Sequence, residues 1–140
     1  MREFQFKRDP HADFEYWAIQ NGQLAKRGGS KALKLREVDR AVWTDLTQRQ
    51  LRIYQLEVAT ATQSVTLTCH DPGGTENLDV FLALCLIVSL EVDEDVPVKL
   101  ETRPLERLFF WRKPQLITAR EFAQLLRGMT APVGRPEDDA

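Results

Sequence analysis

Three side chains that can act as nucleophile, base and acid follow one another at Cys69, His70 and Asp71. In an enzyme, this cluster would be a thiol or proton-transfer site at the end of a strand. Neighbouring strand residues point to opposite faces, however, so the thiol and the imidazole cannot readily form a nucleophile–base pair. We therefore expect a buried cysteine, a surface histidine and a turn formed by Asp71-Pro72-Gly73-Gly74.

The second histidine and the second cysteine do not complete a reactive set. His11 could pair with a carboxylate, but nothing in the sequence brings it to His70, 59 residues further on. Cys85 follows Cys69 by 16 residues, which is neither a CxxC pair nor a zinc-ligand spacing. We predict no metal, no cofactor and no enzymatic activity, with both cysteines acting as small buried apolar residues.

A basic segment with two glycines, Lys26-Arg27-Gly28-Gly29-Ser30-Lys31, is a candidate anion site. Its backbone N–H groups and flanking cations would hold a phosphate or an anionic lipid headgroup. Lys34 and Arg36 would extend the same basic face. The spacing is not the GxxxxGK[ST] of a nucleotide-hydrolysing loop. The alternative is a solvated hairpin connection whose charges favour solubility.

A second candidate contact surface is the aromatic segment Leu108-Phe109-Phe110-Trp111-Arg112-Lys113. Aromatic residues and arginine are typical of the central contacts in protein interfaces. The residues assigned to partner binding are Phe109, Phe110, Trp111 and Arg112. Plain packing of Phe109 and Trp111 over the sheet is an equal alternative, and contact with a membrane surface is a third.

These candidates must be positioned by a chain whose first 70 residues are rich in strand and turn signals. We predict about seven short antiparallel strands there. Asn21-Gly22 indicates a hairpin, because a type I′ turn needs positive φ at both central positions. Residues 31–38 alternate apolar and basic side chains, as in a strand with one buried face. Over residues 51–59 the alternation of apolar and polar side chains shifts by one position at Ile53-Tyr54. This shift indicates either a β-bulge or a strand covered on both faces.

The sequence then changes to an apolar run, for which we predict a helix over 77–92 with Asn77 as its N-cap. The middle of this helix is apolar on every side. Such a helix is either enclosed on all sides or lies in an interface between two copies of the chain. The acidic residues 91–95 that follow are either a solvated helix end or a separate contact surface.

Residues 96–129 form a C-terminal extension in this interpretation. Residues 96–100 are predicted to be extended because Pro97 restricts its neighbour. Residues 104–112 are either a short helix beginning at Pro104 or, over 108–111, a buried strand. Thr118 and Glu121 have the spacing of a capping box and predict a helix over 118–128. We expect one domain over 1–129 and a disordered tail over 130–140.

About seven antiparallel strands followed by an apolar helix resemble the pleckstrin-homology-like architecture over residues 1–92. The start of the helix at Leu78-Asp79-Val80 and its acidic end also resemble the core helix of tubby-like barrels, including the phospholipid scramblase group. These resemblances imply an α+β fold with a strongly bent antiparallel sheet or partial barrel and a helix that plugs it. They also imply an anionic headgroup site near residues 26–36.

Composition limits the functions that such a fold could serve. Hydrophobic residues make up 43% of the chain, which is enough for a folded core. A net charge of −2 and a pI near 5.7 make nucleic acid an unlikely partner. The longest apolar run, 80–88, is well short of the about 20 residues of a membrane span, and the N-terminus has no signal-peptide pattern. We expect a cytoplasmic protein.

The function that these features favour is a non-enzymatic protein-binding or assembly domain. The chain would associate with itself, as a homodimer, or dock on another protein through the 77–92 helix and the aromatic segment. The alternative function is binding of an anionic lipid headgroup or phosphate through the basic 26–36 region.

Overall fold

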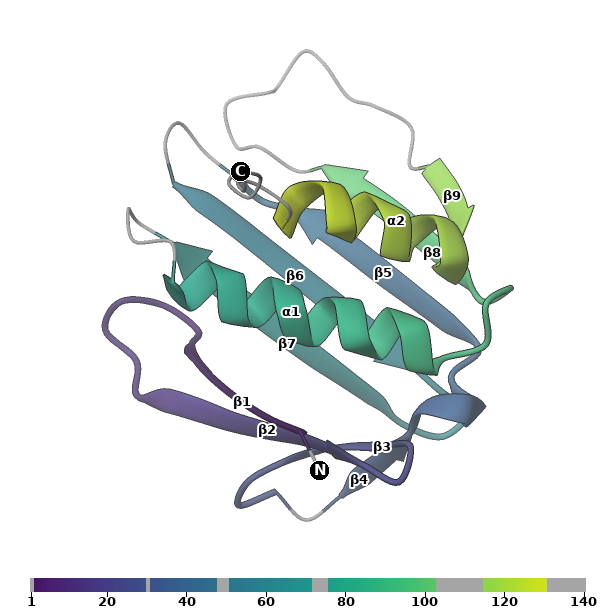
Figure 1. Cartoon of the computed structure of the whole chain (residues 1–140), viewed down its shortest axis with the longest axis horizontal. Helices are drawn as coiled ribbons and strands as arrows, with labels where there is room; N and C mark the ends of the chain where they lie inside the picture. Colours follow the sequence, from purple (N-terminus) through teal and green to yellow (C-terminus); the bar gives the residue numbers. More distant parts are fainter. Residues whose placement is uncertain (1, 30, 48–50, 72–75, 103–114, 131–140) are drawn as a thin grey trace, which may run out of the picture.

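The computed structural model describes residues 2–29, 31–47, 51–71, 76–102 and 115–130, and these form nine strands and two α-helices (Figure 1). The strands are β1 (Arg2–Lys7), β2 (Phe14–Gln20), β3 (Gln23–Lys26), β4 (Ala32–Lys34), β5 (Arg40–Asp45), β6 (Arg52–Ala59), β7 (Ser64–Asp71), β8 (Pro97–Thr102) and β9 (Gln115–Thr118). The helices are α1 (Glu76–Glu91) and α2 (Ala119–Thr130). The fold class is α+β, as predicted.

The first four strands form an antiparallel sheet in the order β1-β2-β3-β4. Asn21 and Gly22, between β2 and β3, have φ angles of 54° and 72°, which confirms the predicted hairpin turn. The strand predicted over 31–38 is much shorter, because β3 offers β4 no partner beyond Gln23, which faces Lys34. The chain turns there into a 3-10 helix, η1 (Leu35–Glu37).

The other five strands form a second sheet in the order β7-β6-β5-β8-β9. β5 pairs antiparallel with β6 and parallel with β8, which enters the sheet after α1. The prediction of one strongly bent sheet or partial barrel of about seven strands is therefore not confirmed. The described residues form two sheets of four and five strands, and the expected helical extension also contributes β8 and β9.

The physical reason for this difference is pairing between distant segments. The number of strands and their order along the chain follow from local sequence patterns. The pairing of β5 with β8 joins two segments that are separated by two strands and a helix. The pleckstrin-homology-like and tubby-like resemblances rest on element order alone, so they carry no information about this pairing.

The shift in the apolar pattern of β6 comes from burial of both faces of the strand and not from a β-bulge. β6 keeps a continuous register with β7 from Arg52 to Ala59. Leu56 faces the helices, whereas Ile53 lies on the opposite face and is 6% exposed. Leu46 donates its backbone N–H to the carbonyl of Ile53 (2.8 Å), so the segment after β5 holds this end of the strand.

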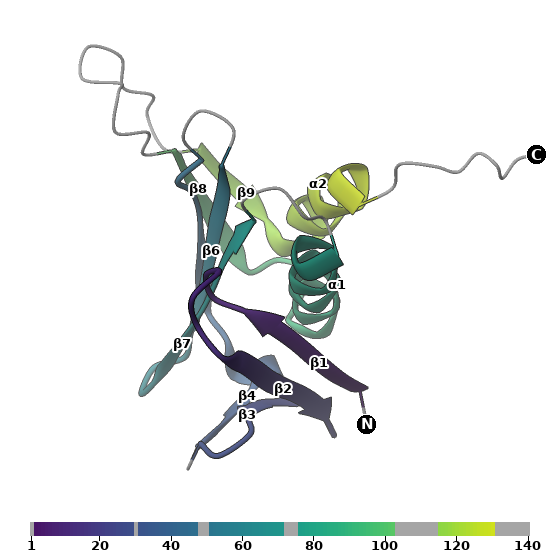
Figure 2. The ribbon, with the colours of Figure 1, turned by 90° about the vertical axis from the view of Figure 1, so that its left-hand side faces the viewer.

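Both helices lie on one face of the five-stranded sheet, and α1 lies between α2 and β1 (Figure 2). Aromatic rings connect these elements through the core. Phe81 of α1 lies 5.3 Å from Phe6 of β1 and 6.3 Å from Trp43 of β5, between ring centroids. Trp43 in turn lies 5.3 Å from Phe122 of α2. Each such pair adds about 0.5–1.5 kcal/mol to the burial of its rings.

Asn77 does not cap α1, because the helix already begins at Glu76. Its side chain pairs with the backbone of β1 instead. The Asn77 Oδ1 accepts the N–H of Lys7 (2.7 Å), and the Asn77 Nδ2 donates to the carbonyl of Lys7 (3.1 Å) and to the Sγ of Cys69 (3.3 Å). One amide therefore joins the start of α1 to the end of β1 and to β7.

The capping box at the start of α2 is confirmed. The Thr118 hydroxyl accepts the N–H of Glu121 (3.1 Å), and a Glu121 carboxylate oxygen accepts the N–H of Thr118 (2.9 Å). The helix continues two residues beyond Gly128, because Met129 packs against the core. In the described part of the chain, neither helix is long and apolar enough to cross a membrane.

Candidate functional site

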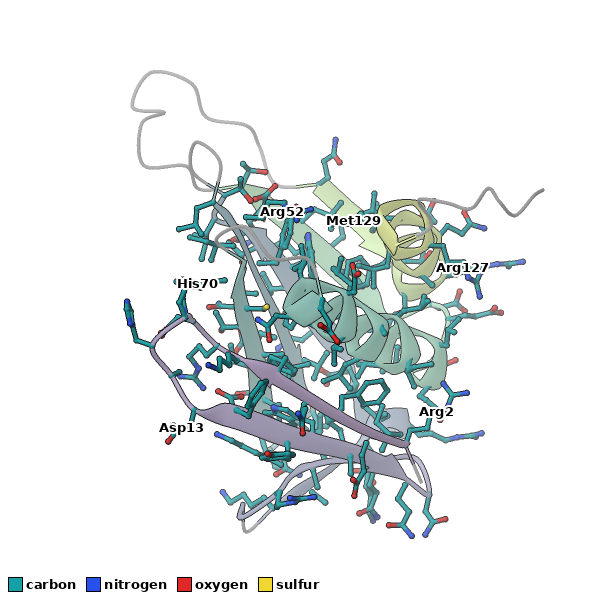
Figure 3. All side chains as sticks on the ribbon, turned by 60° about the vertical axis from the view of Figure 1, so that its left-hand side comes forward. Arg2, Asp13, Arg52, His70, Arg127 and Met129 are labelled. Carbon is teal, nitrogen blue, oxygen red and sulfur yellow. The ribbon has the colours of Figure 1, made fainter. Side chains whose placement is uncertain are left out.

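The residues with reactive side chains do not converge. Cys69 faces the helices and is fully buried, whereas His70 lies on the opposite face of the sheet, paired with Ile53 (Figure 3). Cys85 of α1 is also fully buried, and burial raises the pKa of its thiol well above the ordinary value, with a smaller contribution from Cys69. A thiol in this state is a poor nucleophile at neutral pH.

Among the described residues, the remaining titratable groups form no metal site. His11 is exposed, and its backbone N–H donates to the Oδ1 of Asp9 (2.8 Å) in the turn after β1. Within the described ranges, no three His, Cys, Asp or Glu side chains lie close enough together to hold a metal ion.

The basic residues of the 26–36 region are placed at different points of the N-terminal sheet. Lys26 and Arg27 lie at the end of β3, whereas Lys34 faces Gln23 at the start of that strand. Lys31 is exposed just before β4, and Arg36 belongs to η1. Because Ala25 faces Ala32, Lys31 lies at the same end of the β3–β4 pair as Lys26 and Arg27. The structure separates these three residues from Lys34 and Arg36.

Arg27 already interacts with neighbouring groups. Its guanidinium lies 4.4 Å from the ring centroid of Tyr16 and 3.7 Å from a carboxylate oxygen of Glu3. A hollow of about 210 Å³ lies beside it and includes Glu3, Tyr16, Lys26 and Arg27 in its lining. Because Glu3 offsets one of the two cations, the hollow carries little net positive charge.

A larger hollow, of about 360 Å³, lies at the C-terminal end of α1. It is lined by Arg36, Leu90, Glu91, Val92, Asp93 and Glu94. Its three carboxylates outnumber its single arginine, and the helix end adds partial negative charge. Arg36 therefore faces an acidic surface, not the other basic residues of its region.

An apolar ridge runs along the side of α1 that faces away from the five-stranded sheet. We call it the outer ridge, and it consists of Val80, Ala83, Ile87 and Leu90. The spacing i, i+3, i+7, i+10 places these side chains on one side of the helix. Leu90 is 50% exposed, and the other three are partly exposed. No described strand or helix is drawn beyond α1 on the side away from the five-stranded sheet (Figure 2). Val80 and Ile87 also pack partly against the core, so only part of each side chain reaches the surface.

The opposite side of α1 is the buried one. Phe81, Leu84 and Cys85 are fully buried there. The sequence predicts the helix but not which side stays open, because a helix that is apolar on every side has no polar stripe to mark it. The outer ridge is therefore the feature that sequence reasoning missed.

The other exposed large apolar side chains lie singly on different elements. Phe14 of β2, Leu116 of β9 and Leu125 of α2 are 46%, 70% and 42% exposed. Scattered residues of this kind are ordinary on a protein surface. The predicted partner-binding residues Phe109, Phe110, Trp111 and Arg112 and residues 131–140 of the predicted tail lie outside the described residues.

Comparison with protein-family models, with curated proteins and with solved structures found no match.

Proposed function

We propose that this chain is a non-enzymatic binding module that docks a protein partner on the outer ridge of α1. The observation that carries the proposal is the row of Val80, Ala83, Ile87 and Leu90 along one side of α1, in which Leu90 is exposed and the other three are partly exposed. Contiguous apolar surface of this kind is typical of protein interaction sites.

The state of the reactive side chains supports binding over catalysis. Cys69 and Cys85 are buried, and His70 lies across the sheet from Cys69. Catalysis would need a nucleophile and a base within hydrogen-bond reach of each other. In the described part of the chain, these residues do not meet that requirement.

The basic 26–36 region gives weaker support to the alternative, binding of an anionic headgroup or phosphate. Lys26 and Arg27 line a hollow, but Glu3 lies beside them and Arg36 faces carboxylates at the end of α1. An anion site needs several donors that converge on one point.

Selection from a displayed library of helical peptides tests the proposal. The targets would be the native chain, Leu90→Gln and, as a matched control, Leu116→Gln, which alters another exposed leucine on β9. We expect peptides enriched on the native chain to bind the Leu116→Gln variant equally and the Leu90→Gln variant at least fivefold more weakly. Failure to enrich any peptide, or equal binding to all three proteins, would contradict the proposal.

A further inference from the structure

The outer ridge is bordered by acidic residues at both ends. Glu76 and Asp79 are exposed in the first turn of α1, and Glu91 is exposed in its last turn. The exposed residues Asp93, Glu94 and Asp95 follow directly. The sequence of α1 contains no lysine or arginine, so no side chain of the helix offsets these charges. The partial positive charge of the helix N-terminus offsets only those of Glu76 and Asp79.

At the C-terminal end of the ridge, the described carboxylates outnumber the described cations. Arg36 lines the hollow at the end of α1, and Arg120 of α2 lies 3.9 Å from Glu94. Both members of that ion pair are more than 60% exposed, so water screens the pair and its stabilising effect is small. The C-terminal end of the ridge therefore keeps an excess of negative charge, to which the helix end adds.

We infer that the partner is an amphipathic helix of another protein, with an apolar side that is flanked at both ends by lysine or arginine. This inference rests on the function proposed above and names the chemistry of its partner. The outer ridge extends about 15 Å from Val80 to Leu90, which is about three helical turns. The i, i+3, i+7, i+10 spacing of its side chains is the one with which two helices pack side by side. The small side chain of Ala83 allows a second helix to approach closely near the middle of the ridge.

A second copy of the chain is a poor occupant on grounds of charge. In a two-fold symmetric contact through the ridge, the acidic ends of one copy would meet the acidic ends of the other. Like charges brought together in an interface cost free energy and disfavour that partner. The same repulsion disfavours the surface of an anionic bilayer.

The C-terminal segment 131–140 is also a poor occupant. Its sequence, APVGRPEDDA, contains one valine as its largest apolar residue and ends in three acidic residues before Ala140. It can neither cover four apolar side chains nor neutralise the carboxylates around them.

Three synthetic helical peptides with the same leucine stripe would test the inference on the full chain. They would carry lysine and arginine, glutamine, or glutamate at both flanks, and their affinities would be measured by fluorescence anisotropy. We expect the cationic peptide to bind at least tenfold tighter than the glutamine peptide, and the glutamate peptide to bind most weakly. Raising the salt concentration from 50 to 500 mM should remove most of the cationic advantage.

Variants of the chain separate the two contributions. Glu91→Gln combined with Asp93→Asn should lower the affinity for the cationic peptide about three- to tenfold and leave the affinity for the glutamine peptide unchanged. Leu90→Gln should weaken both peptides by a similar factor. Asp13→Asn, in the turn between β1 and β2, removes a carboxylate away from the ridge and serves as the control (Figure 3).

The outcomes distinguish the inference from the proposal on which it rests. Equal binding of all three peptides, weakened by Leu90→Gln, would keep the docking surface and overturn the basic partner. No binding by any peptide, or binding that Leu90→Gln leaves intact, would overturn both. A dimer in light scattering that dissociates in Leu90→Gln would identify a second copy as the occupant, and Leu90-dependent binding to phosphatidylserine vesicles would identify a membrane. Either result would overturn the inference.

Discussion

The two helices lie side by side on the same face of one sheet, but they differ in how much the sequence determines which side of the helix is buried. α2 has apolar residues on one side, including Phe122 and Leu126, and polar residues such as Gln124 on the other. α1 has no charged residue between Asp79 and Glu91. The sequence of α2 thus determines which side faces the core, whereas the neighbours of α1 determine its orientation.

This difference shows how an apolar surface that is not visible in the sequence can arise. Most of the apolar side chains of α1 are covered by β1, β7 and α2, and the part that is left over becomes the outer ridge. Surface apolarity is therefore a result of packing here, because the pattern of α1 does not separate inside from outside.

The largest expected effect compares the two sides of α1. Leu84 is fully buried, so Leu84→Asp would place a carboxylate where no water can solvate it. We expect a loss of about 4 kcal/mol or more of unfolding free energy, which leaves the chain unfolded. Urea unfolding followed by circular dichroism measures the change.

The matched variant is Ile87→Asp on the outer ridge. Because Ile87 is partly exposed, the new carboxylate keeps contact with water, and we expect a cost of about 1–2 kcal/mol and a folded protein. If both variants unfold, the outer ridge is not open to solvent. If both remain native-like, Leu84 is not buried in the core.

The next effect makes the same comparison on α2. Phe122→Ala removes a ring that packs 5.3 Å from Trp43, and core truncations of this size cost about 3–5 kcal/mol. Leu125→Ala, at a position 42% exposed, should cost less than about 1 kcal/mol. Similar thermal unfolding shifts in the two variants would show that α2 does not have the two-sided character described.

A smaller effect concerns the anchoring of α1 to β1. Asn77→Ala removes both hydrogen bonds to Lys7 and should cost about 2 kcal/mol, since the backbone groups of Lys7 lose their partners. Asn77→Asp keeps an acceptor for the Lys7 N–H but removes the donor to its carbonyl. Hydrogen exchange of the Lys7 amide should therefore be fast in the alanine variant and slower in the aspartate variant.

A substitution at the start of α2 should lower the unfolding free energy less than the Asn77 substitution does. Thr118→Ala removes the hydroxyl that accepts the N–H of Glu121, a change that costs about 1 kcal/mol. Thr118→Ser keeps the hydroxyl and should retain most of the stability. A serine variant as unstable as the alanine variant would mean that the methyl group of Thr118, not its hydrogen bond, is what matters.

The smallest effect is a pH dependence that belongs to α1 and not to α2. Burial raises the pKa of Cys85 above 9.0, so the unfolded chain loses this proton at lower pH than the folded chain. The contribution of this thiol to stability is therefore fully present below pH 9 and is lost as the pH rises, by less than about 1 kcal/mol at pH 9.5. Cys85→Ala should flatten this fall in urea unfolding, although it lowers stability at every pH.

Local features of the fold could be predicted from the sequence, and pairings between distant segments could not. The turn at Asn21-Gly22, the helix that begins near Asn77 and the capping box at Thr118 each depend on a few adjacent residues. The pairing of β5 with β8 and the role of Asn77 depend on segments that meet only in the folded chain. A sequence pattern records which residues seek burial, but not which partner buries them.

The same limit applies to the candidate site. The basic residues from Lys26 to Arg36 are close in sequence, but the β3–β4 hairpin and η1 place them at different points. The outer ridge could not be assigned beforehand, because any side of α1 would have served equally well. Its position follows from β1 and α2 occupying the sides next to it.

The parallel pairing of β5 with β8 limits how early the five-stranded sheet can be completed during synthesis. During synthesis β5 emerges long before Pro97, the first residue of β8. Until β8 arrives, one row of backbone donors and acceptors on β5 has no native partner, and a strand edge in that state recruits foreign strands. A growing chain, or one that ends before Pro97, thus exposes this strand edge to aggregation from the completion of β5 until β8 arrives.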